Sequence, residues 1–157
     1  MEAVALSAGV SKGTVYATFG SRGQLIAEMT IAGLEDSERS FRAAAASSTP
    51  TWDALVGVVA QPQAVFFARP DLSAPDAPDD RVHDAFTRAR DAFAELLRRG
   101  QHEGLVRPDI TINHVQTLFH GMYLAVGDYS EDRLVDIAFY AQIILRGLAA
   151  TPPTATH

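Results

Sequence analysis

Side chains that can contact a phosphate or a base edge are concentrated between Ser11 and Arg22, near the start of the chain. Their spacing predicts a short helix over residues 12–19, because Ser11 can cap its first turn and a glycine follows its last. Val15 and Phe19 would lie on the buried side of that helix. The polar side chains left for its other side are Lys12, Thr14, Tyr16 and Thr18. Such a surface suits contact with the backbone and base edges of nucleic acid.

A helix-turn-helix would hold this surface against the major groove. Residues 1–8 are predicted to form its first helix, in which Ala5 and Ala8 are small enough for a second helix to cross closely. Gly9 supplies the tight turn, since glycine adopts left-handed backbone angles without steric cost. The sequence therefore predicts a two-helix reading unit that ends at Gly20.

A longer helix over residues 21–45 is expected to connect this unit to the rest of the chain. Ser21 serves as its N-cap, and Gln24 completes a capping-box pattern. Its apolar stripe consists of Leu25, Ile26, Met29, Leu34 and Phe41. We therefore expect residues 1–45 to form a head with its connecting helix, and residues 46–150 to form a separate body.

The charge distribution favours contact with nucleic acid at one end of the protein. The 157 residues carry a net charge of −6, which by itself would oppose binding to phosphates. Before Glu28, however, the only acid is Glu2, whereas Lys12 and Arg22 are basic. A mildly basic head on an acidic body suits a protein that touches DNA with one end.

Composition favours a folded protein and gives no positive case for catalysis. Hydrophobic residues make up 47% of the chain and charged residues 20%, which allows a buried core, and cysteine is absent. The apolar runs are shorter than the roughly 18 residues of a membrane helix, so we expect a soluble, cytoplasmic protein without membrane contact. The five histidines fit no ligand spacing, and no catalytic arrangement stands out. We therefore expect no metal, no cofactor and no enzymatic activity.

Helical periodicity continues through the remainder of the chain, so the predicted fold is all-α. A body helix is expected to begin at Thr51 and to break at Pro62, followed by helices over residues 80–103, 111–126 and 131–149. Residues 69–80 are rich in proline and aspartate and are expected to form a loop, and residues 151–157 a disordered tail.

Residues 8–22 read AGVSKGTVYATFGSR, which resembles the DNA-binding signature of TetR-type transcriptional regulators. That signature joins an alanine-glycine-valine turn to a serine-lysine-glycine-threonine helix start, a tyrosine, a phenylalanine and then a basic residue. The match is nearly complete over this stretch, whereas the rest of the chain agrees in helical architecture. The resemblance implies a homodimeric repressor that binds a palindromic double-stranded DNA operator and is released by a small apolar or aromatic effector.

The resemblance also implies roles for individual residues of the head. Tyr16 would give its hydroxyl to a phosphate, Thr18 would contact the backbone, and Arg22 would hold another phosphate. Direct base reading would fall to Lys12, Thr14 and Ala17. Because Ala17 is small, specificity would lean on methyl contacts or on DNA shape. The residues expected at DNA are Ser11, Lys12, Gly13, Thr14, Tyr16, Ala17, Thr18 and Arg22.

In the body, the resemblance implies an effector pocket and a dimer interface. Each pocket residue taken singly more often belongs to an ordinary helical core, and it is the aromatic group as a whole that favours a pocket. The residues expected to line the pocket are Phe66, Phe67, Phe86, Phe93, Phe119, Met122 and Tyr123. Apolar stripes on the last two helices suggest a four-helix interface, with two helices from each subunit. The residues expected there are Val115, Phe119, Leu134, Ile137, Ala141, Ile144 and Leu148.

Members of the family also have a helix ahead of this unit, which packs across it and contacts the DNA backbone. The sequence begins at Met1, within what the resemblance makes the first helix of the motif. If the preceding helix is absent from the protein, we expect weak or no DNA binding. The alternative function is then a dimeric ligand-binding or interaction module, and a basic amphipathic helix encoded ahead of Met1 would argue against it.

Overall fold

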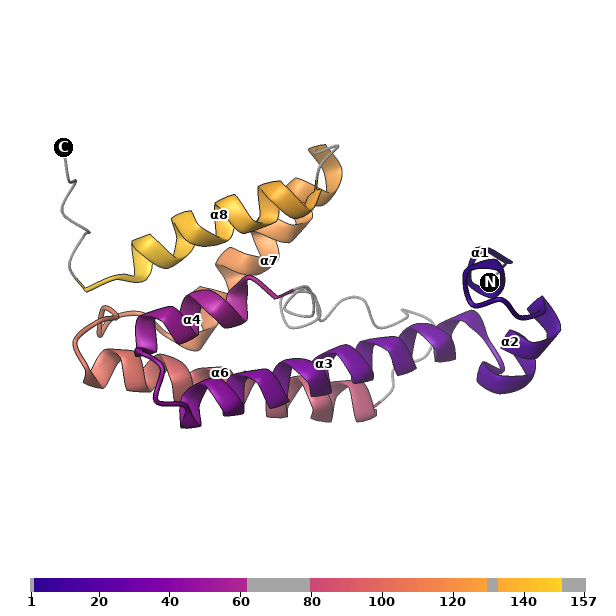
Figure 1. Ribbon diagram of the computed structural model, residues 1–157, viewed down its shortest axis with the longest axis horizontal. Helices are drawn as coiled ribbons and strands as arrows, with labels where there is room; N and C mark the ends of the chain where they lie inside the picture. Colours follow the sequence, from indigo (N-terminus) through magenta and orange to yellow (C-terminus); the bar gives the residue numbers. More distant parts are fainter. Residues whose placement is uncertain (1, 62–79, 130–132, 151–157) are drawn as a thin grey trace.

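The computed structural model describes residues 2–61, 80–129 and 133–150, and these residues form the all-α fold predicted from the sequence (Figure 1). A small head at one end of the molecule consists of two short helices and the beginning of a long third one. The body contains the remaining helices. In chain order the helices are α1 (Glu2–Ser7), α2 (Lys12–Phe19), α3 (Arg22–Ala46), α4 (Thr51–Val59), α6 (Asp80–His102), α7 (Ile112–Tyr129) and α8 (Arg133–Leu148).

The observed helix boundaries follow the sequence signals closely. Helix α2 has the predicted bounds, α4 begins at Thr51, and α3 and α6 each end within one residue of the predicted position. Local caps explain this agreement, because Ser11 and Ser21 accept hydrogen bonds from the first turns of α2 and α3. The predicted break at Pro62, the loop over residues 69–80 apart from Asp80, and the tail over residues 151–157 lie outside the described residues.

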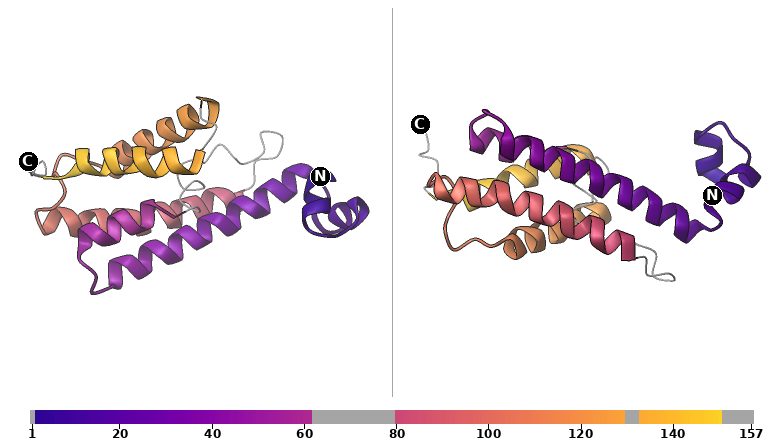
Figure 2. Two further views of the ribbon diagram at one scale, coloured as in Figure 1. Left: turned by 45° about the horizontal axis from the view of Figure 1, so that its top comes forward. Right: turned by 90° about the horizontal axis from the view of Figure 1, so that it is seen from below.

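Helices α3 and α6 lie side by side along most of the body and run in the same direction (Figures 1 and 2). Phe41 of α3 and Phe93 of α6 meet edge to face, with ring centroids 5.1 Å apart and planes inclined by 73°. Both side chains are almost fully buried. The core also takes in α4, α7 and α8, and its largest fully buried apolar side chains are Phe41, Phe93, Leu34, Leu55, Leu96, Val106 and Val115.

The buried face of α3 contains two hydroxyl residues that the predicted apolar stripe omits. Thr30 and Ser37 are buried. The Thr30 hydroxyl donates to the carbonyl of Ile26 and the Ser37 hydroxyl to that of Gly33, each at 2.8 Å within α3. Each hydroxyl is therefore satisfied within α3, which allows these polar side chains to be buried. Met29, which the stripe included, is 52% exposed. The stripe was therefore wrong at Met29, while Leu25, Leu34 and Phe41 are buried as predicted.

The last helix is tied back to the turn between α6 and α7. Val106 and Ala149 form an isolated antiparallel bridge. The amide of Arg107 donates to the carbonyl of Leu148, and the amide of Ala150 donates to that of Leu105, both at 2.9 Å. These bonds fix the end of α8 and therefore help to determine which face of α8 turns outward.

Candidate nucleic-acid interface

A tight turn joins α1 to α2 in the head. Gly9 has φ +67°, its amide donates to the carbonyl of Leu6 at 3.2 Å, and the amide of Val10 donates to the carbonyl of Ala5 at 3.0 Å. This pair of bonds is the Schellman pattern, which ends a helix on a left-handed residue. Any side chain at Gly9 would strain this conformation, so the glycine predicted for the turn is required there.

A cluster of hydroxyls organises the start of α2. The Ser11 Oγ accepts from the amide of Thr14 at 3.0 Å and lies 2.8 Å from the Thr14 Oγ1. One amide of the first turn is thereby satisfied, and the two hydroxyls are held against each other at the N-terminus of the helix. Because an anion is favoured at such a terminus, the arrangement is suited to a DNA phosphate.

Helix α2 packs against the other helices of the head through one buried residue. Val15 is 4% exposed and packs with Ala5 and Leu25 in a cluster separate from the body core, and Phe19 packs against that cluster while partly buried. All eight residues predicted to meet DNA are exposed: Ser11, Lys12, Gly13, Thr14, Tyr16, Ala17, Thr18 and Arg22. The structure therefore brings all eight predicted residues to the surface of the head.

Two of these side chains differ in what they can offer to DNA. The Tyr16 ring is 43% exposed. The Thr18 hydroxyl, in contrast, donates to the carbonyl of Thr14 at 2.9 Å within α2. Its proton is therefore already used by the helix, which weakens the backbone contact predicted for Thr18.

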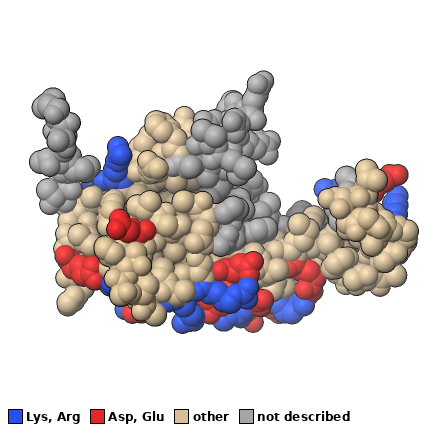
Figure 3. Space-filling view, in the orientation of Figure 1, with Lys and Arg blue, Asp and Glu red and all other residues tan. Residues whose placement is uncertain are grey.

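The head contains few charged groups compared with the body (Figure 3). Lys12 and Arg22 are its cations and Glu2 is its acid, as read from the sequence. Along the lower edge of the molecule in this view, acidic and basic side chains of α3 and α6 alternate. Among the described residues, no helix is long and apolar enough to cross a membrane, and no group of three or more potential ligands could hold a metal ion.

The predicted pocket residues that the structure describes belong to the body core. Phe93, Phe119 and Met122 are buried there, and Phe86 packs against the core while partly buried. Phe66, Phe67 and the side chain of Tyr123 lie outside the description. The structure thus groups four of the seven residues in one core, and their role in effector binding stays a prediction.

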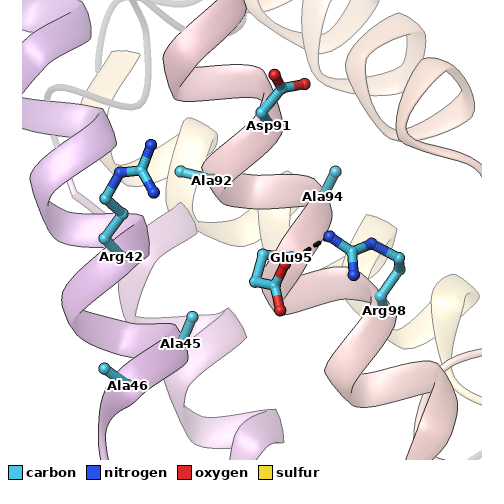
Figure 4. A pocket seen from close by; sticks show the side chains of 8 residues that line it. All are labelled: Arg42, Ala45, Ala46, Asp91, Ala92, Ala94, Glu95 and Arg98. Atoms are coloured by element: carbon cyan, nitrogen blue, oxygen red, sulfur yellow. Dashed lines mark hydrogen bonds and ion pairs between the residues drawn. The ribbon is translucent and has the colours of Figure 1, made fainter.

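A cleft of about 740 Å³ opens elsewhere, between α3 and α6 on the outer side of the body (Figure 4). Alanines form much of its lining, and charged side chains stand along both walls. Its lining residues are Arg42, Ala45, Ala46, Asp91, Ala92, Ala94, Glu95 and Arg98. None of these residues belongs to the aromatic set predicted to bind the effector. The cleft depends on how two helices that are far apart in the sequence pair, so it could not be predicted from the sequence alone.

Most of the described residues predicted for the dimer interface are already used within the protomer. Val115, Phe119, Ala141 and Leu148 are buried in the body core, Ile144 packs against it, and the side chains of Leu134 and Ile137 are not described. The same two helices also carry exposed apolar side chains that sequence reasoning missed. These residues, called the outer face below, are Leu118 (47%), Phe139 (59%), Tyr140 (45%) and Ile143 (50%).

The signal for the outer face is present in the sequence of α8. Phe139 and Ile143 are four residues apart and so share one side of a helix, opposite to Ala141, Leu145 and Leu148. A helix with apolar residues on opposite sides is expected to be covered on both. The stripe selected from the sequence was the one that faces the protomer core.

Family models of known proteins match both the N-terminal and the C-terminal part of the chain. Residues 1–29 match the family model for bacterial regulatory proteins of the tetR family, and residues 38–150 match the model for the C-terminal domain of SbtR-like transcriptional regulators. The structure is similar to the crystal structure of a TetR transcriptional regulator from Streptomyces coelicolor, with a TM-score of 0.66 and 23% identity over 98% of this chain and 87% of that one. That likeness shows a shared fold. No curated protein matches the chain.

Proposed function

Because the chain belongs to the TetR family of bacterial regulatory proteins, we propose that it is a homodimeric regulator that places α2 of each subunit in the major groove of a palindromic operator. The observation that carries this proposal is the presentation of α2. Its buried residue Val15 holds the helix on the head, while the hydroxyls, Lys12 and Tyr16 face outward. A gel shift with DNA from the promoter region of the protein's own gene tests the proposal. A lack of specific, salt-sensitive binding by the protein with its native N-terminus would reject it.

Replacing Lys12 by alanine is expected to weaken operator binding by about 30-fold, since each head of the dimer loses a cation at the groove. The slope of log affinity against log salt should also become shallower by about two, because one cation per head no longer neutralises the charge of the phosphates around the groove. Fluorescence anisotropy across a salt series measures both quantities. Lys12→Arg keeps the charge and is the matched control. Equal salt slopes for Lys12→Ala and the unmodified protein would contradict a contact between Lys12 and DNA.

The hydroxyls of Tyr16 and Thr18 are expected to differ in their importance for binding. Tyr16→Phe removes from each head a donor that is free to reach a phosphate and should cost about a hundredfold in affinity, the effect of two hydrogen bonds to charged groups at about 1.5 kcal/mol each. Thr18→Val removes a hydroxyl that is satisfied inside α2, and affinity should stay within about twofold. Anisotropy titrations of both variants on the same operator make the comparison. A larger loss for Thr18→Val than for Tyr16→Phe would reverse this assignment.

The outer face supports the proposal that two copies associate through α7 and α8. Four large apolar side chains from the two helices are each between 45% and 59% exposed. Gly121 and Gly147 lie on exposed positions of the same helices, and a Cβ added at either would meet nothing within 4 Å. Small residues among large apolar ones allow helices of two subunits to approach closely. We therefore assign the dimer contact to the outer face.

We also propose that the protein represses transcription and that a small apolar effector releases it. The effector would bind in the body and favour a conformation whose two heads no longer match the operator spacing. The family model for the C-terminal domain and the grouping of Phe86, Phe119 and Met122 in one core support this part. Reporter expression from the protein's own promoter, with and without the gene, distinguishes repression from activation.

A further inference from the structure

Charged residues on α3 and α6 follow matching heptad spacings. On α3 the positions are Glu28, Glu35 and Arg42, and on α6 they are Arg81, Arg88 and Glu95. Residues seven apart lie on the same side of a helix, so each series forms one row. Because the two helices run side by side in the same direction (Figures 1 and 2), the two rows come in the same order along the seam. At each level the two charges have opposite sign.

Ion pairs join the rows at the first two levels. The Nη2 of Arg81 lies 2.8 Å from the Oε1 of Glu28. Arg88 bridges two carboxylates one turn apart, with its Nε 3.1 Å from the Oε2 of Glu38 and its Nη2 3.6 Å from the Oε1 of Glu35. Burial alone would raise the pKa of the Glu38 carboxyl, but hydrogen bonds from Arg42 and Arg88 outweigh it and hold that pKa below its usual value. The Glu38 carboxylate that Arg88 contacts is therefore charged at neutral pH.

At the third level, Arg42 and Glu95 do not pair with each other across the seam. Arg42 turns to Glu38 of its own helix at 2.9 Å, and Glu95 pairs with Arg98 of its own helix at 2.5 Å. Figure 4 shows Arg42 and Glu95 on opposite walls of the cleft between the two helices. The ion pairs between the two rows are thus concentrated at the end of the seam that lies nearer the head.

The first pair lies where the head joins the body, a region called the neck below. Leu25 belongs to the small core of the head, whereas Ala27, two residues later, belongs to the core of the body. Glu28 follows directly, and its partner Arg81 is in the first turn of α6. The pair therefore connects the body to α3 within one turn of the point at which α3 leaves it.

The apolar seam is thin at the neck and thick farther from it. Near the neck the buried residues of α3 are Ala27 and Thr30, and those of α6 are Val82 and Ala85. The interlocking rings of Phe41 and Phe93 lie at the other end. Because small side chains bury little area, packing resists a change in the direction of α3 less at the neck than beyond it.

We propose that Glu28 and Arg81 form an electrostatic latch at the neck, which fixes the direction in which α3 leaves the body and so the orientation of the DNA-reading head. This inference rests on the proposed function for what the head binds, whereas the latch itself is a property of the protein without DNA. Both partners are partly exposed, so the latch weakens as salt rises. It acts on orientation, because exposed pairs add little to overall stability.

The latch can be tested by distance measurements between two spin labels. The chain has no cysteine, so labels can be placed at Ser7→Cys in the head and Asp53→Cys in the body, both exposed positions. Diluting labelled protein with unlabelled protein suppresses distances between subunits. Pulsed electron paramagnetic resonance then gives the head-to-body distance distribution in the absence of DNA. Circular dichroism of each variant checks that the helices are retained.

Arg81→Glu is expected to at least double the width of that distribution, because two glutamates then face each other at the neck. The exchanged pair Glu28→Arg with Arg81→Glu should restore the original width. Arg39→Glu is the matched control, since Arg39 pairs with Asp36 on α3 itself and the change in charge is the same. About 1 M salt should widen the distribution of the unmodified protein in the same way, because screening then reaches down to about 3 Å.

An unchanged width in both Arg81→Glu and high salt would overturn the latch, as would a widened distribution that the exchanged pair fails to restore. If Arg81→Glu does not fold, Arg81→Gln and the salt series on the unmodified protein decide the question. A gel shift of the same samples separates the two claims. Operator binding with an unchanged distance distribution would reject the latch alone, and a responsive latch without operator binding would reject the proposed function alone.

Discussion

Replacing Ile143 by glutamate is expected to separate the proposed dimer into monomers and to reduce the proposed operator binding to the level of non-specific DNA. Ile143 is 50% exposed in the protomer and lies on the outer face beside Phe139. In a dimer built on this face, the substitution would bury an unpaired carboxylate in each subunit. The cost of an uncompensated buried charge is about 3–5 kcal/mol, which raises the dissociation constant of the dimer by at least about a hundredfold.

The loss of operator binding follows from symmetry. A palindromic operator is read by two heads at a fixed separation, and a monomer retains contact with one half-site. Light scattering after size exclusion measures the oligomeric state, and anisotropy measures binding. Leu105→Glu is the matched control, because Leu105 is 37% exposed but lies in the turn after α6. A dimer that survives Ile143→Glu would place the interface elsewhere.

The head was predictable from the sequence because its signals are local. Ser11 and Ser21 cap helices whose first turns follow them directly, and Gly9 takes the positive φ that the turn requires. These residues act on neighbours within three positions of the chain. No knowledge of distant contacts is needed to place them, so α2 has the predicted bounds and its predicted DNA-facing residues are exposed.

The seam between α3 and α6 was less predictable, because two effects there depend on tertiary pairing. Thr30 and Ser37 count as polar in a sequence, yet their hydroxyls bond to carbonyls of their own helix and both side chains are buried. The heptad rows of charge are visible in the sequence, but only the parallel pairing of the two helices makes Arg81 the partner of Glu28. The cleft beside Arg42 arises from the same pairing.

Replacing Phe93 by alanine is expected to lower the free energy of unfolding by about 3–5 kcal/mol, the usual cost of deleting a buried phenylalanine ring. Phe93 is 1% exposed and meets Phe41 at 5.1 Å, so the truncated side chain would leave a cavity at the thick end of the seam. For a chain of 157 residues this corresponds to a fall of roughly 10 °C in melting temperature. Denaturation at a fixed protein concentration measures the change, since association contributes to stability in a dimer.

The size of this loss decides between two interpretations of Phe93. The sequence-based prediction places Phe93 in an effector pocket, and a residue that mainly lines a pocket would alter effector response with little loss of stability. The packing against Phe41 instead predicts a large loss of stability. Met29→Ala is the control on α3, since Met29 is 52% exposed and should change stability by less than about 0.5 kcal/mol. A loss for Phe93→Ala as small as that of the control, together with an altered effector response, would return Phe93 to the pocket.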